Sequence, residues 1–217
     1  MADTTSRTGI TYSTPEILGY LQRVHVPHDA GLEQAFTAPD RHGVPAIQVG
    51  PSEGKLLELL ARLVTARRIV EVGTLVGYST IHLARGMTPE GRLWTCEYEP
   101  ANARLARQHL TAAGLADRVE VVEGAALDTL PGLERHGPFD IVFIDADKRN
   151  YDEYGRWALG HLRPGGLLLG DNAFLFGRLL EDSPEGAAMR RFHEEAAAAC
   201  HTVCIPTPDG LLLGIRR

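Results

Sequence analysis

The sequence predicts a single α/β domain, built on a mostly parallel β-sheet with helices on both faces. Two observations predict this fold. After residue 53, short and almost continuously apolar runs alternate five times with helical segments, and strands buried on both faces of a parallel sheet have this composition. The chain then ends in two apolar runs around Pro208-Asp209-Gly210, a tight turn that predicts a β-hairpin.

The predicted elements follow one another without an internal repeat. An amphipathic helix over 53–66 comes first. The predicted strands are 68–73, 92–97, 119–124, 139–145 and 165–171, and the helices that follow them are 78–87, 100–114, a short one ending near 133, 150–162 and 184–200. Proline at its start and glycine at its end delimit the helix over 100–114. The terminal hairpin, 201–217, is expected to add one antiparallel strand at an edge of the sheet.

Residues 1–50 are less regular than the rest of the chain. They contain one predicted helix, with Thr14 as its N-cap and Pro15 at the first helical position. A stretch rich in Pro, His and Gly follows, and the regular pattern begins at Glu53. We therefore divide the chain into an N-terminal segment, 1–50, and a domain over 51–217.

The composition disfavours several classes of protein. The formal net charge is −6 and the pI is about 5.8, so the chain has no overall basic surface for nucleic acid. The apolar runs are too short to span a bilayer, and the polar N-terminus has no apolar signal core. We therefore expect a cytoplasmic protein without a membrane partner. Three cysteines, Cys96, Cys200 and Cys204, fit reduced thiols.

Polar residues gather where the predicted strands end, at the edge where open α/β sheets bind ligands. Gly73 and Gly77 flank a strand-to-helix turn in VEVGTLVGYST, residues 70–80. This turn lacks the paired glycines that bring backbone against a pyrophosphate, and on its own it could reflect strand–helix packing. Glu97 ends the second strand, where a carboxylate can accept both hydroxyls of a ribose. Together they predict a nucleoside cofactor without a pyrophosphate, such as S-adenosylmethionine (SAM).

A second polar group follows the fourth and fifth strands. Asp145 ends the fourth strand in FIDADK, and Asp171 and Asn172 end the fifth in LLLGDN. Neighbouring parallel strands lie about 4.8 Å apart, so three side-chain oxygens could converge on one cation. Two carboxylates and an amide suit Mg²⁺. Taken singly, these acids could equally cap helices, but together with Lys148 they favour a metal site.

In VEVGTLVGYST, CEYEP, FIDADKRNYDEY and GDNAFLFG, the sequence resembles the cation-dependent catechol-type O-methyltransferases, which include the caffeoyl-CoA O-methyltransferases. The resemblance runs from about Thr14 to the C-terminus, and the pairing of DADK-x-x-Y with a downstream DN is its most specific part. It implies a Rossmann-like class I methyltransferase fold with a seven-stranded sheet. It also implies methyl transfer from SAM to one hydroxyl of a vicinal dihydroxy aromatic, with Mg²⁺, Mn²⁺ or Ca²⁺ as the cation.

The resemblance also implies roles for matching residues. The expected cofactor contacts are Val49, Glu71, Gly73, Thr74, Ser79, Glu97, Asp145 and the turn from Gly124 to Ala126. Asp145, Asp171 and Asn172 would bind the cation. Lys148 would be the general base, with Asp145 as a second catalytic residue near the methyl donor; Asp147 is given no role. A homodimer is implied too, in which residues 1–50 help to close the site.

Two departures and three alternatives stay open. The late helix of this family often carries an F-N pair, where this chain has Phe192-His193, and an ordinary surface or helix role is expected for His193. Members of this family often carry tryptophan in D-N-x-x-W-x-G, where this chain has Leu175, so the shape of the acceptor pocket is uncertain. Some relatives methylate a hydroxylated uridine of transfer RNA, although the acidic net charge argues against such an acceptor. A nicotinamide-dependent oxidoreductase would need the missing pyrophosphate loop. A cofactor-binding protein without catalysis would not need the complete set of acids and lysine.

Overall fold

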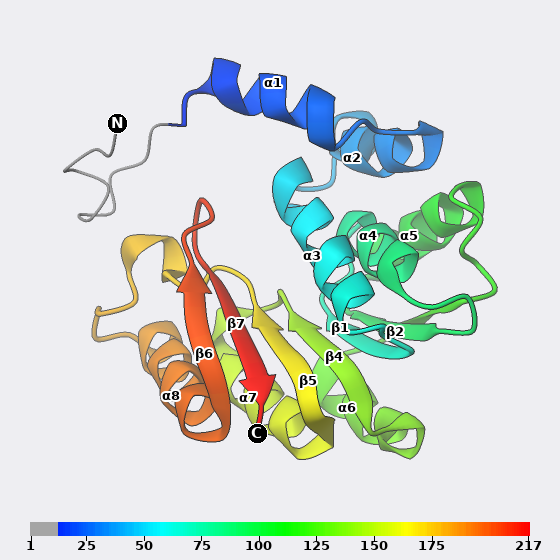
Figure 1. Cartoon of the computed structure of the whole chain (residues 1–217). Coiled ribbons are helices and arrows are strands. Elements are labelled where there is room, and N and C mark those ends of the chain that lie inside the picture. Colours follow the sequence, from blue (N-terminus) through cyan, green and yellow to red (C-terminus); the bar gives the residue numbers. More distant parts are fainter. Residues whose placement is uncertain (1–12) are drawn as a thin grey trace.

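A seven-stranded sheet forms the centre of the computed structural model, which describes residues 13–217 (Figure 1). Its strand order is β3-β2-β1-β4-β5-β7-β6. The bounds are β1 Arg68–Val72, β2 Arg92–Glu97, β3 Val119–Glu123, β4 Phe139–Ile144, β5 Leu162–Gly170, β6 Cys200–Ile205 and β7 Leu211–Arg216. All pairings among β1 to β5 are parallel. The predicted α/β fold with a mostly parallel sheet is thus confirmed.

The C-terminal hairpin differs from the prediction in its placement. The antiparallel strand is β7, but it lies between β5 and β6 and not at the edge. The edge strand is β6, which runs parallel to β5. Burial explains this order, because Leu211 and Leu212 of β7 are buried whereas most of β6 is exposed or half-buried. The more apolar run therefore takes the inner position.

Helices cover both faces of the sheet (Figure 1). Their bounds are α3 Pro51–Leu63, α4 Tyr78–Gly86, α5 Pro100–Ala112, α6 Ala126–Leu133, α7 Tyr151–His161 and α8 Pro184–Ala199. Alternate strand residues face opposite layers. Ile69 joins the apolar cluster of α3, α4 and α5, whereas its neighbour Val70 joins that of α6, α7 and α8. The domain is therefore a three-layer sandwich with two cores.

Two helices precede this sandwich, and the sequence predicted only the first. In α1 (Pro15–His25) the Thr14 side chain accepts from the backbone N–H of Ile17, as expected of an N-cap. The second, α2 (Ala30–His42), occupies the stretch interpreted as irregular. It is capped by Asp29, whose Oδ1 accepts from Leu32 N at 3.0 Å. Its proline, Pro39, lies in the last turn, where it lacks the N–H that would donate to the carbonyl of Ala35.

The first 12 residues, from which the lack of a signal core was inferred, lie outside the described part of the chain. Among residues 13–217, no helix combines the length and apolar character needed to cross a membrane.

Candidate active site

The predicted site lies where the strand order reverses, between β1 and β4. Open α/β sheets bind ligands at this point, beyond the carboxyl ends of the strands. The backbone N–H of Asp145 donates to Val72 O at 2.8 Å, so the two strand ends run side by side. Gly73 has a φ of +98°, and a Cβ at this position would lie 1.9 Å from Asp145 O. Only glycine permits this approach.

Glu97, the predicted ribose acid, is buried at the end of β2 and braces the turn after β1. Its Oε2 accepts from the backbone N–H groups of Thr74 at 3.2 Å and Leu75 at 2.7 Å, and its Oε1 accepts from Glu99 N at 2.9 Å. Each carboxylate oxygen can accept more than one hydrogen bond. The carboxylate therefore fixes the turn. Because Asn102 Nδ2 also donates to Oε1, at 3.4 Å, a ligand hydroxyl would take the place of this long hydrogen bond.

The remaining predicted cofactor residues lie around the same edge. Gly124 N donates to Glu97 O at 2.9 Å, which brings the turn after β3 next to the end of β2. Ala126 begins α6 directly after this turn. Val49 is buried just before α3 and lines a hollow together with Asp171. The structure thus brings the predicted residues of four chain segments to one edge of the sheet.

Glu71 is fully buried and enclosed by hydroxyl groups. Ser79 Oγ donates to Oε1 at 2.6 Å, and Thr80 and Thr95 donate to Oε2 at 2.5 and 2.6 Å. Burial raises the pKa of Glu71 to about 7 despite these three donors. Sequence reasoning predicted Glu71 and Ser79 but missed the two threonines, because their hydroxyls come from different elements, α4 and β2.

The buried carboxyl of Glu71 should make stability depend on pH. A pKa raised from 4.5 to about 7 means that the folded protein holds a proton which the unfolded chain loses first. The contribution of Glu71 to the free energy of unfolding should therefore fall by about 3 kcal/mol as pH rises through this window, and level off above it. Urea unfolding of wild type and Glu71→Gln between pH 4.5 and 8 measures this, and an equally steep fall in the variant would contradict it.

Asp145, Lys148 and Asp171 lie close together beyond β4 and β5, and Asn172 follows Asp171 at the end of β5. Lys148 Nζ lies 3.2 Å from Asp145 Oδ1, and Asp171 N donates to Ile144 O at 2.9 Å. Burial, with a further contribution from the charge of Asp145, raises the pKa of Asp171 to about 7. A divalent cation would relieve both effects, so these residues fit a hard metal ion. Within residues 13–217, no group of three or more His, Cys, Asp or Glu side chains is placed to hold a metal; the predicted set has only two carboxylates.

Tyr151 is a site residue to which sequence reasoning assigned no function. Its hydroxyl lies 2.5 Å from Ile144 O and 2.6 Å from Asp171 O, so it ties the ends of β4 and β5 together. Its ring centroid lies 4.8 Å from Lys148 Nζ, a distance at which the ring face attracts an ammonium. The spacing DADK-x-x-Y contained the signal, since it places Tyr151 one helical turn after Lys148. Asp147, by contrast, accepts from Tyr154 and Asn150 and braces the start of α7.

A hollow of about 600 Å³ opens next to the predicted metal ligands. It is lined by Ile47, Gln48, Val49, Glu53, Asp171, Asn172, Phe174, Phe176, Gly177, Pro208 and Asp209. Leu175, which raised the question about the acceptor pocket, is 1% exposed and packs in the core under α8. The walls come instead from its neighbours Phe174 and Phe176, so the departure from tryptophan does not remove the aromatic lining.

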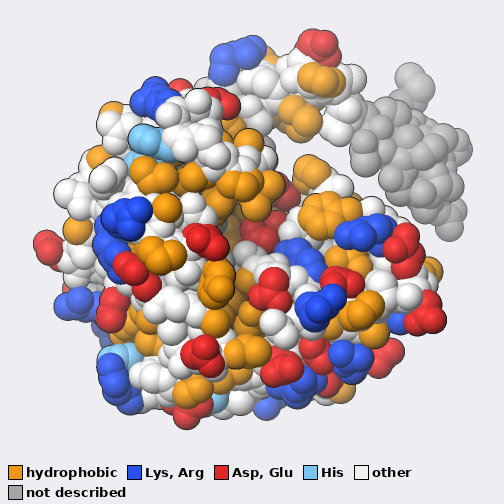
Figure 2. Space-filling view, turned by 180° about the vertical axis from the view of Figure 1, so that it is seen from behind, with side chains coloured by type: hydrophobic (Ala, Val, Ile, Leu, Met, Phe, Trp, Pro, Cys, Tyr) orange, Lys and Arg blue, Asp and Glu red, His pale blue; other side chains and the backbone are white. Residues whose placement is uncertain are grey.

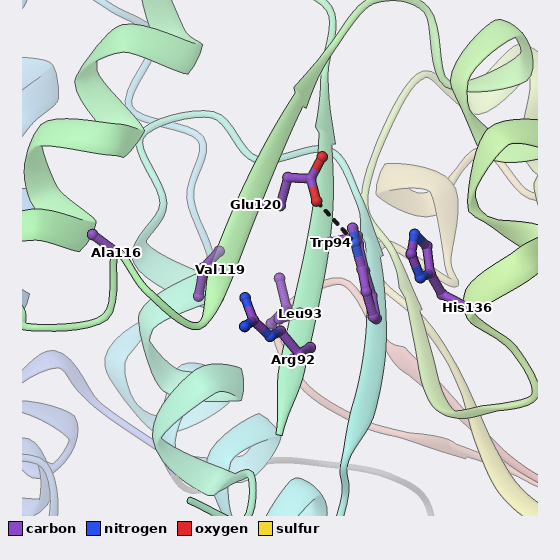
Figure 3. Close-up of a pocket in the computed structure, with 7 residues that line it drawn as sticks. All are labelled: Arg92, Leu93, Trp94, Ala116, Val119, Glu120 and His136. Atoms are coloured by element: carbon purple, nitrogen blue, oxygen red, sulfur yellow. Dashed lines mark hydrogen bonds between the residues drawn. The ribbon is translucent and has the colours of Figure 1, made fainter. Parts of the chain in front are cut away.

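A second hollow, of about 530 Å³, lies at the amino ends of β2 and β3 (Figure 3). There Trp94 stacks on His136, with ring centroids 4.5 Å apart, and donates from Nε1 to Glu120 Oε2 at 3.1 Å. None of the predicted site residues lines it. Its place opposite the ligand-binding edge of the sheet separates it from the candidate active site.

Comparisons with known proteins point to one family. A family model described as O-methyltransferase matches residues 26–217. A catechol O-methyltransferase of Mycobacterium tuberculosis is 47% identical over 175 residues, 81% of this chain and 79% of the relative. One of Niastella koreensis is 44% identical over 183 residues, with coverages of 82% and 80%. The solved O-methyltransferase TomG of Streptomyces achromogenes, in complex with SAM, superimposes with a TM-score of 0.87 at 39% identity, covering 93% and 96% of the two chains.

Proposed function

Because this chain belongs to the O-methyltransferase family, we propose that it transfers a methyl group from SAM to one hydroxyl of a catechol-type aromatic, with a divalent cation and with Lys148 as general base. The observation that carries this proposal is the meeting of two carboxylates, an amide and an ammonium beside the glycine turn at the switch point. The names of the two curated relatives support a catechol acceptor, and the SAM-bound TomG supports the cofactor.

The proposal assigns the cofactor to the edge formed by β1, β2 and β3. Glu97 would accept hydrogen bonds from the ribose, and the turn containing Gly73 and Thr74 would lie against the cofactor backbone. Ser79 and the enclosed Glu71 would hold this turn near the amino-acid end of SAM. Val49 and Ala126 would close the site from either side, and Asp145 would lie near the methyl donor.

The cation would be held by Asp145, Asp171 and Asn172, with few enough protein ligands to leave positions for the acceptor. When bound, it would lower the pKa of the acceptor phenol, ordinarily about 10, and orient its two oxygens. The side chains around the acceptor would hold its oxygen in line with the methyl group, within about 3 Å of it.

Lys148 would remove the proton of the acceptor hydroxyl. Its side chain is only 14% exposed and lies beside Asp145, one of the proposed metal ligands. A general base must lie within hydrogen-bonding reach of the proton that it takes, and an acceptor hydroxyl next to Asp145 would satisfy this condition. Tyr151 would keep the amine in position through its ring face.

The first test is release of S-adenosylhomocysteine from SAM with a panel of vicinal dihydroxy aromatics, in Mg²⁺ or in EDTA. We expect product only with a diol and only with the cation. Product that ignores EDTA would remove the metal from the proposal and reassign Asp145, Asp171 and Asn172. If no diol gives product, the proposed catechol acceptor is wrong and an RNA acceptor is favoured instead.

We further propose a homodimer in which α1 packs against the partner, with residues 1–50 acting as a lid over the site. No residue of α1 is buried, and five of its apolar side chains, Ile17, Leu18, Tyr20, Leu21 and Val24, are 39–59% exposed. Figure 2 shows α1 at the upper edge of the molecule, with hydrophobic side chains open to solvent. An apolar surface of this kind is typical of an interface.

Light scattering should therefore give twice the chain mass of 23.7 kDa. Leu18→Glu with Leu21→Glu should give a monomer, because charges would enter the apolar interface. A monomeric wild type at micromolar concentration would contradict the dimer.

A further inference from the structure

We propose that the acceptor hollow favours catechols whose side arm carries a cation or a hydrogen-bond donor and disfavours anionic ones, with Asp209 as the residue that sets this preference. This inference rests on the proposed function and adds a subclass of acceptor to it. It assigns a role to the C-terminal turn, which contains none of the predicted site residues.

The charges around the hollow have one sign. Its charged lining residues are Glu53, Asp171 and Asp209, and no Lys, Arg or His of residues 13–217 lines it. A cation held by Asp145 and Asp171 would balance those two carboxylates. Glu53 and Asp209 would remain as uncompensated negative charges along the acceptor. Arg178 directly follows Gly177 in the chain but is not part of the lining.

Asp209 has one oxygen committed and one without a partner. Oδ1 accepts from Phe176 N at 2.8 Å, and the backbone carbonyl accepts from Phe174 N at 2.9 Å. These bonds fasten the turn to the loop that carries Asn172. Oδ2 is buried and has no hydrogen-bond partner among residues 13–217. A buried acceptor left unpaired is unfavourable, so a donor on the ligand would be stabilising here.

Gln48 presents a second acceptor in the same lining. Its Nε2 donates to Phe36 O at 3.0 Å, which fixes the orientation of the amide. Its Oε1 is then left buried, without a partner in the described part of the chain. Both free oxygens are enclosed, and rim side chains Phe176, 62% exposed, and Ile47, 71% exposed, would turn aside to admit the arm of a ligand.

The aromatic walls fit the same subclass of acceptor. Phe174 and Phe176 line the hollow on the side of Asp209. A ring face attracts a cation within about 6 Å of its centroid. A protonated amine could therefore contact aromatic faces and two free oxygens, one of which belongs to the Asp209 carboxylate. A carboxylate arm would have no basic side chain of the described lining to pair with.

Three acceptors with the same ring and a two-carbon arm test the inference: dopamine, which is cationic at neutral pH, hydroxytyrosol, which is neutral, and dihydroxyphenylacetate, which is anionic. We expect kcat/KM to fall in that order, with an amine-to-acid ratio of about tenfold or more at low salt, as charges a few Å apart in a partly buried site would give. Equal values, or a preference for the acid, would overturn the inference but not the proposed function. No methylation of any of the three would overturn both.

Asp209→Asn identifies the residue. The variant keeps an oxygen for Phe176 N but loses the charge, so the amine-to-acid ratio should fall by about threefold or more. If Asp209 had a purely structural role, the variant would lower kcat/KM for all three acceptors alike and leave the ratio intact. That result would overturn the assignment. If Asp209→Asn does not fold, Glu53→Gln takes its place in the test. It keeps an acceptor for Gly50 N and should lower the ratio too. Glu90→Gln, the same charge change near the amino end of β2, is the control and should leave the ratio unchanged.

Discussion

Replacing Lys148 with alanine is expected to lower kcat by about 10²- to 10⁴-fold, the usual contribution of a general base. The affinity for S-adenosylhomocysteine should stay within about twofold, because no proposed cofactor contact involves this side chain. Single-turnover kinetics measure the first quantity and isothermal titration calorimetry the second. An equal loss of cofactor affinity would contradict the assignment of Lys148 as the base.

The composition of the chain sharpens this test. It contains two lysines, Lys55 and Lys148, against twenty arginines. A guanidinium stays protonated at any pH at which the enzyme works, whereas an amine can give up its proton. Lys148→Arg would keep the charge next to Asp145 and the contact with Tyr151, yet it should be as inactive as alanine. Lys55→Ala is the matched control, because Lys55 pairs with Glu58 on α3 and should leave kcat unchanged.

Much of the fold could be predicted because its strands are buried on both sides. Continuous apolar runs have few other interpretations in a chain of this length. The order of the last two strands was not predicted, because both runs read as strands, although the more apolar of the two takes the inner position. Helix α2 was missed because Gly31 and Pro39 resemble helix breakers. Tertiary packing explains the glycine, since a Cβ there would lie 3.0 Å from Ala113 of the segment after α5.

The candidate site divides in the same way. Asp145, Asp171 and Asn172 could be placed together from sequence, because neighbouring parallel strands end at one edge. The hydroxyls around Glu71 could not, since Thr80 and Thr95 lie in elements whose side-chain directions depend on packing. The free oxygens of Gln48 and Asp209 belong to segments joined only in three dimensions. Pattern thus predicts which residues end strands, and only structure shows which side chains meet.

Replacing Asp171 with alanine is expected to abolish the dependence of turnover on Mg²⁺. It removes one of the two carboxylates proposed to hold the cation, so turnover should fall by about 10²-fold or more. The residual activity should no longer respond to EDTA. Mn²⁺ binding, followed by electron paramagnetic resonance in the absence of acceptor, should weaken in parallel. Persistent EDTA-sensitive activity in this variant would contradict the ligand assignment.

Stability separates a metal ligand from a structural carboxylate in the same variant. The pKa of Asp171 is raised to about 7, so above that pH the ionised group destabilises the metal-free fold. Asp171→Ala should therefore be at least as stable as metal-free wild type at pH 8, although it loses turnover. Asp117→Ala, at an exposed loop position, is the control and should change neither stability nor turnover. A carboxylate needed for folding would give the opposite result, a variant that unfolds more easily. We expect a metal ligand to lower the stability of the metal-free protein and to be required for turnover when the cation is bound.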